Sequence, residues 1–387
     1  MHALPAVAPQ ASVPRCEQRP ARSDAEGDAA RSMQRKRGDD ATGAGAHRTA
    51  GLAERVVAWQ RSHGRNTLPW QNTRDPYRVW LSEIMLQQTQ VATVVDYYAR
   101  FLARFGDVGA LAAAPLDDVL ALWSGLGYYS RARNLHSCAR AVVSDHGGSF
   151  PRTSAELMRL PGIGRSTAAA IAAFCFGERV AILDGNVRRV LTRVLGDARD
   201  LSLAANERAL WCVATDLLPG RGIARYTQGL MDLGATLCTA RAPACGACPL
   251  APICVARAEG APERYPVKSR RPARGTRENW WLWLEWRGKV WLQQRPARGV
   301  WAGLWTLPLL DGESRADAVA RALGVELESL PAVQHALTHF DWTLHPRRAR
   351  LARRPDGALP GPGRWVARSD LPSIALPAPL KRLLLLA

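Results

Sequence analysis

The chain has 387 residues, which is too long for one ordinary hydrophobic core and predicts two or three domains. Hydrophobic residues make up 47% of it and charged residues 22%, so a wholly disordered or collagen-like protein is excluded. Lys and Arg outnumber Asp and Glu by 52 to 34, and the formal net charge of +18 favours a polyanionic partner, nucleic acid before an anionic membrane. No apolar run reaches the ~18–20 residues of a membrane span and no signal pattern opens the chain, so we expect a soluble, cytoplasmic protein.

Residues 1–48 consist mainly of Ala, Arg, Gly, Pro and Asp, with almost no large apolar residue. Such a segment cannot bury enough surface to offset the entropy of ordering, so we predict a disordered tail. It holds eight basic and six acidic residues, so the positive charge of the chain lies almost entirely beyond it. A start rich in Arg and Ala is typical of an organellar transit peptide, but the six acidic residues argue against one.

Residues 49–256 have apolar positions that recur at intervals of three and four, as in Leu116, Val119, Leu120 and Trp123. This period predicts a helical domain. Residues 257–279 hold five Pro or Gly residues and a run of basic residues without periodicity, which predicts a basic linker.

Residues 280–387 contain nine of the 14 Trp residues. The strand-like segments 281–283 and 289–292 flank an Arg287-Gly288 turn, a pattern that predicts a β-hairpin. A helical pattern at 316–323 and a strand-like segment at 333–337 complete an α+β domain.

Four of the eight cysteines cluster, with the spacing Cys238-x6-Cys245-x2-Cys248-x5-Cys254. In a chain without a secretion signal, clustered cysteines argue for metal before disulfides, and four thiolates in one short loop can enclose a compact iron–sulfur cluster. Zinc is the alternative. Structural zinc sites usually pair two C-x2-4-C knuckles, and here only Cys245 and Cys248 form one, so the spacing favours iron and sulfur.

This spacing resembles the 4Fe-4S loop of the endonuclease III and MutY family of DNA glycosylases. The resemblance implies one 4Fe-4S cluster bound by the four cysteines at 238–254. It also implies a multidomain protein whose residues 49–256 form an all-α helix-hairpin-helix glycosylase domain. In that family the loop places basic residues on DNA phosphates, and Arg241 lies within it here.

The segment Leu160-Pro161-Gly162-Ile163-Gly164-Arg165-Ser166-Thr167 precedes a helical run. Two glycines one residue apart let backbone N–H groups approach a phosphate at a helix N-terminus, although an ordinary interhelical turn has the same pattern. The segment is similar to the family's helix-hairpin-helix, at about residues 155–175, which implies sequence-independent DNA binding through Gly162, Gly164 and Ser166. In bifunctional members a lysine stands at the position of Ser166 and forms a Schiff base. A serine hydroxyl cannot do so, and we expect little or no AP lyase activity.

Residues 74–89 predict a helix that begins near Pro76. Within it, the positions three and four residues from Glu83 are largely apolar. Desolvation raises the pKa of a carboxyl group and suits a general acid, although a surface or paired glutamate is the commoner case. The segment resembles the MutY motif around its proton-donating glutamate, which implies that Glu83 protonates adenine at N7.

A second acid, Asp184, follows the apolar run 180–183 and stands where a helix N-cap is expected. It resembles the catalytic aspartate of the family, which implies an ionised carboxylate that stabilises an oxocarbenium-like sugar. The resemblance also implies that Asn186 belongs to the same catalytic centre. The reaction needs both Glu83 and Asp184, because one carboxyl group must protonate the leaving base while the other balances the positive charge of the sugar.

Flipping a base out of duplex DNA requires side chains that stack or wedge. Gln88 and Tyr128 resemble the intercalating positions of the family, although a tyrosine is also a common core residue. Leu68, Trp70 and Gln228 resemble residues that line its adenine pocket.

Residues 295–308 resemble part of the Nudix-like C-terminal domain of MutY proteins, which recognises 8-oxoguanine opposite adenine. The sequence shows no catalytic Nudix box with its Glu cluster, so pyrophosphatase activity is not implied. The lesion-reading Phe-Ser-His of the family appears here as Leu337-Thr338-His339. Thr338 keeps the hydroxyl group and His339 is retained, but the aromatic ring is lost.

Together these motifs identify the chain as a member of the MutY family. They imply a monofunctional adenine DNA glycosylase of base excision repair that acts on A:8-oxoguanine or A:G mispairs in double-stranded DNA. We expect a monomer with no membrane partner, nucleoid-associated if bacterial. Three alternatives remain: an endonuclease III-like pyrimidine glycosylase and AP lyase, which Ser166 disfavours; a non-catalytic iron–sulfur DNA-binding protein, which would not need Glu83; and a regulator with a zinc loop.

Overall fold

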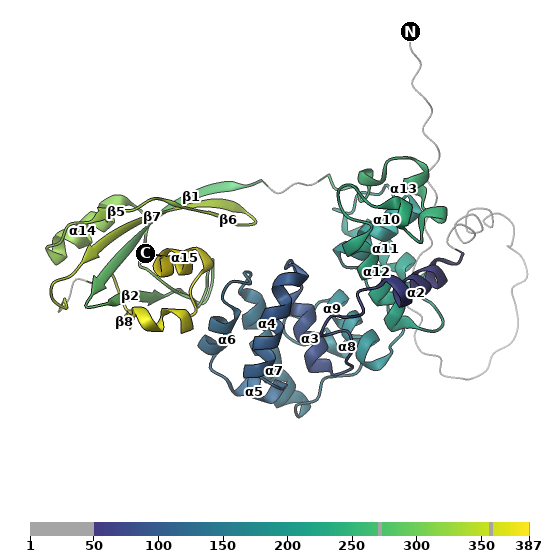
Figure 1. The fold of residues 1–387 in the computed structure, drawn as a ribbon, viewed down its shortest axis with the longest axis horizontal. Helices are drawn as coiled ribbons and strands as arrows, with labels where there is room; N and C mark the ends of the chain where they lie inside the picture. The colour runs from purple at the N-terminus through teal and green to yellow at the C-terminus, as the bar shows by residue number, and fades with distance from the viewer. Residues whose placement is uncertain (1–49, 270–272, 356–358, 387) are drawn as a thin grey trace, which may run out of the picture. The chain divides into compact units, whose positions relative to one another are not determined.

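The computed structural model describes residues 50–269, 273–355 and 359–386, which belong to two compact units (Figure 1). Unit 1 combines Met1–Asn72 with Arg165–Arg270, and unit 2 combines Thr73–Gly164 with Arg271–Ala387. The chain therefore leaves unit 1 soon after its first described helix and returns to it at Arg165. The predicted tail, residues 1–48, lies outside the described residues.

Unit 1 is helical, and its core lies where α12 packs against both α2 and α10. Two glycines permit this approach: a Cβ atom on Gly229 would lie 2.6 Å from Cγ1 of Val56, and one on Gly234 would lie 2.6 Å from Cβ of Asn186. The helices are α2 (Leu52–His63), α9 (Arg165–Ile171), α10 (Gly185–Leu195), α11 (Ala204–Asp216), α12 (Ile223–Thr236) and α13 (Val255–Ala258), with the π-helix η1 (Ala172–Phe176) and the 3-10 helices η2 (Cys245–Ala247), η3 (Ala251–Ile253) and η4 (Pro262–Arg264).

The first part of unit 2 is also helical. The helix predicted near Pro76 is confirmed: it begins at Pro76, and Asp75 caps it by accepting a hydrogen bond from the backbone N of Tyr77 at 2.9 Å. Large aromatic side chains such as Trp80, Phe101 and Trp123 are fully buried between these helices. The helices are α3 (Pro76–Met85), α4 (Val91–Arg104), α5 (Val108–Ala113), α6 (Leu116–Trp123), α7 (Ser130–His146) and α8 (Ser154–Leu157).

The second part of unit 2 is an eight-stranded sheet with the main order β3-β2-β1-β7-β5. Its long central strands β1 and β7 run parallel, and its other pairs are antiparallel. The strands and helices are β1 (Gly275–Trp286), β2 (Lys289–Gln294), β3 (Trp305–Thr306), β4 (Leu309–Leu310), β5 (Glu328–Ser329), β6 (Val333–Ala336), β7 (Phe340–Arg350), β8 (Arg364–Ala367), α14 (Glu313–Leu323), η5 (Arg368–Ser373) and α15 (Ala378–Leu386).

The predicted hairpin is confirmed in this sheet, since Trp286 of β1 faces Lys289 of β2. Arg287 and Gly288 form the turn with φ angles of 44° and 71°, the left-handed backbone that a two-residue hairpin loop requires. The helical pattern at 316–323 lies within α14. Strand β1 begins at Gly275, inside the segment expected to be a linker, and residues 270–272 of that segment lie outside the described residues.

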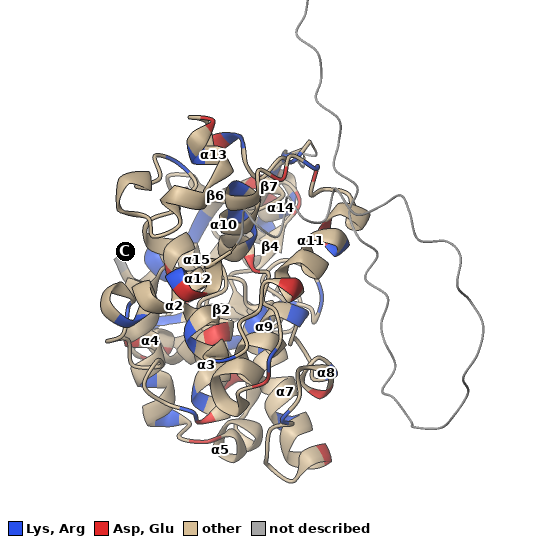
Figure 2. Ribbon diagram, turned by 90° about the vertical axis from the view of Figure 1, so that its right-hand side faces the viewer, with Lys and Arg blue, Asp and Glu red and all other residues tan. Residues whose placement is uncertain are grey.

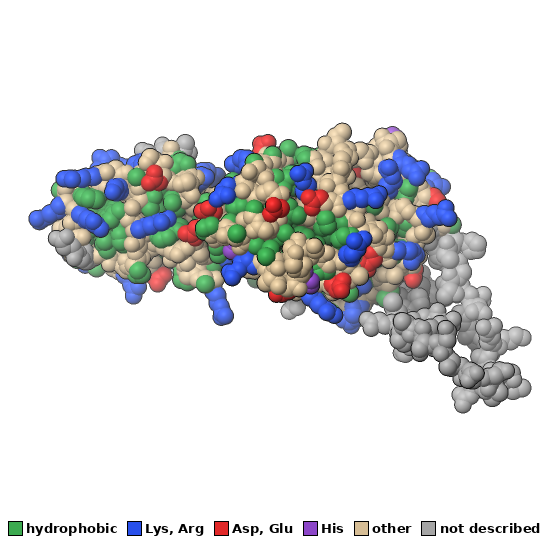
Figure 3. All heavy atoms as spheres, turned by 90° about the horizontal axis from the view of Figure 1, so that it is seen from below, with side chains coloured by type: hydrophobic (Ala, Val, Ile, Leu, Met, Phe, Trp, Pro, Cys, Tyr) green, Lys and Arg blue, Asp and Glu red, His purple; other side chains and the backbone are tan. Residues whose placement is uncertain are grey.

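Basic residues recur along the helices and strands of the chain (Figure 2). On the face drawn in Figure 3, Lys and Arg side chains stand out at several places, with acidic and apolar side chains between them. Throughout the described ranges, no helix combines the length and the apolar character that crossing a bilayer requires.

Candidate active site

Asp184 is the N-cap of α10, as the sequence predicts. Its Oδ1 accepts a hydrogen bond from the backbone N of Val187 at 2.7 Å, and its Oδ2 faces Nδ2 of Asn186 at 3.5 Å. Burial raises the pKa of the Asp184 carboxyl group, while the hydrogen bonds from Val187 and Asn186 and the positive charge of Arg189 act in the opposite direction. The carboxylate is therefore both desolvated and held by donors at a helix N-terminus, where a negative charge is stabilised.

Asn186 is fixed from two sides. Its Oδ1 accepts a hydrogen bond from Nη2 of Arg189 at 2.9 Å, and its Cβ lies against Gly234 of α12. The same arginine donates from Nε to the backbone carbonyl oxygen of Cys238 at 2.7 Å. Neither Arg189 nor Gly234 was among the predicted site residues. The signal that could have revealed Gly234 is a glycine within a helical segment, which costs stability unless another element packs closely against it.

The four clustered cysteines line one cavity with apolar side chains of α10, α12 and the loop, such as Val190, Leu233 and Leu250. Arg193 lies beside this cavity and donates from Nη1 to Sγ of Cys238 at 3.3 Å, and Sγ of Cys254 lies 3.5 Å from the carbonyl oxygen of Arg193. Burial raises the pKa of the Cys248 thiol to about 11, so a metal would have to ionise it on binding.

These residues fit an iron–sulfur cluster. The thiols surround an apolar space with a cationic donor at its edge, the type of surroundings that tunes such a cluster. Within the described part of the chain, no three His, Cys, Asp or Glu side chains are placed to hold a single metal ion. Cys238, Cys245, Cys248 and Cys254 would hold the cluster.

An ion pair with a buried carboxylate lies beside the predicted base-binding residues of unit 1. The side chain of Asp232 is 0% exposed, and it binds Arg65 through the backbone N at 3.1 Å and through Nε at 2.7 Å. Gln228, one helical turn earlier, donates to the same carboxylate at 3.0 Å. Leu68 is half-buried and donates its backbone N–H to Oε1 of Gln71 at 3.4 Å. Trp70 is buried.

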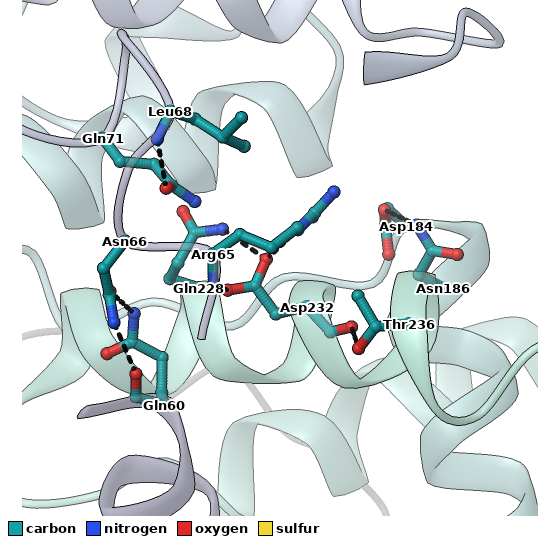
Figure 4. Close-up of polar contacts among 10 residues, drawn as sticks. All are labelled: Gln60, Arg65, Asn66, Leu68, Gln71, Asp184, Asn186, Gln228, Asp232 and Thr236. Carbon is teal, nitrogen blue, oxygen red and sulfur yellow. Dashed lines mark hydrogen bonds and ion pairs between the residues drawn. The ribbon is translucent and has the colours of Figure 1, made fainter. Parts of the chain in front are cut away.

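Figure 4 shows Arg65, Leu68, Gln71, Gln228 and Asp232 together with Asp184 and Asn186. The guanidinium end of Arg65 points to the side on which Asp184 lies. The structure thus gathers the predicted residues Leu68, Gln228, Asp184 and Asn186 in one part of unit 1. Sequence reasoning missed Arg65 and Asp232, although an aspartate inside the apolar face of a helix is itself a signal of a buried, paired charge.

Glu83 lies on α3 in unit 2 and is half-buried. Its neighbours Val79 and Trp80 are buried, as expected from the apolar pattern around it. The end of α3 is held by Arg131, which donates from Nη1 to the carbonyl oxygens of Ile84 at 2.8 Å and Met85 at 2.9 Å. Glu83 and Asp184, the two predicted catalytic carboxylates, belong to different units.

A cavity of about 260 Å³ in unit 2 brings together Gln88, Tyr128 and Gly162. Gln88 and Tyr128 are exposed and have positive φ angles of 55° and 46°, which is unusual for residues other than glycine. Arg131 hydrogen-bonds to the residues next to both of these positions. Its Nη2 donates to Oγ1 of Thr89 at 3.1 Å and to the carbonyl oxygen of Gly127 at 3.2 Å. Burial lowers the pKa of Arg131 to about 10.

Within the predicted phosphate-binding hairpin, Gly162 and Gly164 end the first stretch of unit 2, and α9, which holds Ser166, begins the second stretch of unit 1 directly after them. Gly162 has a φ of 76°, and a Cβ atom there would lie 2.6 Å from Cβ of Asn134, so only glycine fits. Gly164 is exposed, and Ser166 lies in the first turn of α9. The preceding Arg165 stacks over Trp211 at 3.9 Å.

Thr338 and His339 are exposed in the loop between β6 and β7. Leu337 donates its backbone N–H to Phe340, and Gly275 donates its own to His339, which fix this loop to β7 and β1. The hydroxyl groups of Tyr128 and Thr338 lie 3.5 Å apart. Within unit 2, the predicted intercalating tyrosine and the predicted lesion-reading threonine are therefore neighbours.

Three family models match the chain. Residues 81–212 match the HhH-GPD superfamily of base excision DNA repair proteins, and residues 238–254 match the iron–sulfur binding domain of endonuclease III. Residues 279–386 match the NUDIX domain. The last match agrees with the α+β fold of the C-terminal part, and the second identifies the cysteine loop as one that binds a 4Fe-4S cluster rather than zinc.

Several curated relatives are similar over most of the chain. An adenine DNA glycosylase of Buchnera aphidicola (subspecies Acyrthosiphon pisum) is 34% identical over 78% of this chain and 87% of its own length. The adenine DNA glycosylase of Mus musculus is 34% identical over 84% of this chain and 76% of its own. Among solved structures, a thermostable thymine-DNA glycosylase is 29% identical, with a TM-score of 0.51, and the match covers 57% of this chain and all of that one.

Proposed function

The chain belongs to the adenine DNA glycosylase, or MutY, family, and from this membership we propose that it removes adenine from double-stranded DNA in which adenine is mispaired with 8-oxoguanine or guanine. The observation that carries the proposal is Asp184, a half-buried carboxylate held at a helix N-terminus by Val187 and Asn186. Cleavage of a glycosidic bond builds up positive charge on the sugar. A carboxylate in this position can stabilise that charge.

In this proposal Glu83 donates a proton to N7 of adenine, and the bond between N9 of adenine and C1′ of the sugar breaks. The electrons of the bond leave with the base, and Asp184 remains ionised beside the oxocarbenium-like sugar. Water then adds to C1′ and loses a proton to the solvent. Asn186, held by Arg189, orients the groups at this centre.

We propose that Gln88 and Tyr128 enter the duplex where the adenine leaves it, and that Thr338 and His339 contact 8-oxoguanine. The short distance between Tyr128 and Thr338 supports this assignment. Gly162, Gly164 and Ser166 would bind phosphate, while Leu68, Trp70 and Gln228 would line the adenine pocket. A 4Fe-4S cluster, when bound, would order the loop 238–254 so that its basic residues meet the DNA backbone.

We further propose that the enzyme is monofunctional and acts as a monomer, with residues 49–256 as its glycosylase domain and residues 280–387 as its lesion-reading domain. Ser166 supports the first statement, because a hydroxyl group cannot form the imine that an AP lyase needs. Water is therefore the final nucleophile.

The test is single-turnover excision on two labelled duplexes, adenine opposite 8-oxoguanine and thymine glycol opposite adenine, with borohydride trapping. We expect adenine loss that becomes a strand break only after alkali, without a trapped adduct. Cleavage of thymine glycol with a trapped imine would instead place the enzyme with the pyrimidine glycosylase and AP lyases. Binding of DNA without excision of either base would favour a non-catalytic protein.

A further inference from the structure

The buried carboxylate of Asp232 accepts hydrogen bonds from more than one residue. Its side chain is 0% exposed, and its two oxygens accept two hydrogen bonds from Arg65 and one from Gln228. A buried carboxylate is costly unless it is paired, and the ion pair with Arg65 meets that need. The bond from Gln228 is a separate feature, because Gln228 is one of the residues expected to meet the base.

This third bond fixes the direction of the Gln228 amide. A carboxylate only accepts hydrogen bonds, so Gln228 must turn its NH2 group to Asp232. The carbonyl oxygen of Gln228 then points away from Asp232, to the side on which Gln71 lies (Figure 4). Asp232 thus makes Gln228 an acceptor toward anything bound beside it.

Gln71 offers a donor on the same side. Its Oε1 accepts a hydrogen bond from the backbone N of Leu68, and its Nε2 is buried and finds no hydrogen-bond partner among the residues that the structure describes. A buried donor without a partner is unfavourable, so a ligand that brings an acceptor to it gains a hydrogen bond.

The donor of Gln71 and the acceptor of Gln228 match the two kinds of group on the edge of adenine. The exocyclic N6 amino group of adenine donates, and the ring nitrogens next to it accept. Hypoxanthine has the same size and shape but carries a carbonyl oxygen in place of the amino group. That oxygen would face the carbonyl oxygen of Gln228.

We propose that Asp232 is a positioning residue that sets the base specificity of the pocket, by holding Gln228 as an acceptor for the amino group of the base. This inference rests on the proposed function, because it takes the base beside Leu68 and Trp70 to be adenine. Asp232 does not touch the base. It acts through Gln228 and, by way of Arg65, through the backbone of the loop that carries Leu68.

Asp232→Asn tests the inference in the full-length protein with its cluster, because asparagine has the same shape but carries an NH2 group. Gln228 and Nε of Arg65 both donate to Oδ1 of Asp232, while the backbone N of Arg65 donates to Oδ2. An asparagine whose Nδ2 replaces that Oδ1 still accepts from the backbone N of Arg65, and its NH2 group lets the Gln228 amide turn over and present a donor. We would measure single-turnover excision of adenine and of hypoxanthine opposite 8-oxoguanine. The ratio of the two rates should fall by at least about tenfold, because a site built for one hydrogen-bonding pattern rejects the other strongly. Asp216→Asn, an exposed position on α11, is the matched control and should keep the ratio of the wild type.

The outcomes distinguish a failure of this inference from a failure of the proposed function. A variant that slows both bases in proportion, or leaves the ratio unchanged, overturns the inference and leaves Asp232 as a structural ion pair. Should Asp232→Asn not fold, Gln228→Leu decides, because it leaves the pair of Asp232 and Arg65 intact: it should lose the preference for adenine over unsubstituted purine, and an unchanged preference overturns the inference. A wild type that excises no adenine refutes the proposed function itself.

Discussion

Nε of Arg189 donates a hydrogen bond to the backbone carbonyl oxygen of Cys238 at 2.7 Å. Nη2 of the same guanidinium group donates to Asn186, which in turn faces Asp184. One side chain therefore joins the first cysteine of the cluster loop to the amide beside the proposed catalytic carboxylate. A disturbance of the loop can reach Asn186 directly through this arginine.

Arg189→Met should separate cluster binding from catalysis. The variant keeps all four cysteines, so we expect unchanged iron content, but Asn186 loses the donor that fixes it. Excision in single turnover should fall by about 10–100-fold, the range expected when a positioning contact is lost. Arg208→Met, at an exposed position on α11, is the control. Full activity of Arg189→Met would show that the link has no role in catalysis.

Asp184→Asn should abolish excision without lowering stability. Asparagine caps a helix as well as aspartate does, so α10 stays capped. The folded-state pKa of Asp184 is raised by burial, so its contribution to stability is present at low pH and is lost as pH rises through that pKa. At neutral pH the ionised group therefore costs stability, and the variant should melt at a temperature no lower than the wild type. A clear drop in melting temperature would contradict this account.

The raised pKa of Asp184 also predicts the acid limb of the pH–rate profile. Only the ionised carboxylate stabilises the sugar cation, so the single-turnover rate should fall as pH decreases through the pKa of Asp184. Because burial raises that pKa, the fall should begin at a higher pH than for a free aspartate. A rate that stays constant down to the pKa of a free aspartate would argue against Asp184 in this role.

Glu83→Gln removes the proposed proton donor but keeps the shape of the side chain. Loss of a general acid typically costs 10²–10⁴-fold, and excision should fall by about that factor or more. Affinity for the mispaired duplex, measured by gel shift, should stay within a few fold of the wild type. Glu54→Gln, an exposed change on α2, serves as the control. Turnover at the wild-type rate would disprove the assignment of Glu83.

Cys248→Ser should lower iron content, solubility and DNA affinity together. The Cys248 thiol lines the apolar cavity of the cluster, and without the cluster this cavity has no filling. Metal analysis, the visible absorption spectrum and a DNA titration measure the three effects. Cys212→Ser, outside the cluster spacing, should change none of them. An iron-free wild type with full activity would remove the need for the cluster.

Much of the fold and of the candidate site could be predicted from the sequence, because the sequence patterns that specify them lie within short segments. Pro76 after Asp75, Asp184 before an amphipathic run and Arg287-Gly288 between strand-like segments each specify backbone geometry within a few residues, and the structure confirms all three. The four cysteines act in the same way, since their spacing along the chain already limits the group that they can hold.

The remaining features depend on contacts between residues far apart in the sequence. Arg65 meets Asp232 across 167 residues, and Arg131 reaches α3 across more than 40 residues. No pattern within either segment identifies its partner. The division into two units could not be predicted either, because Asn72 ends a stretch of unit 1 and Thr73 begins unit 2 without a change in composition.

The most direct test of the account is release of free adenine by the full-length protein with its cluster, in single turnover on matched duplexes that place adenine opposite 8-oxoguanine, guanine or thymine. We predict release from the first two duplexes and none from the A:T pair, which contains no mispaired adenine. Absence of adenine release from the 8-oxoguanine duplex by a protein that binds it would contradict the central claim.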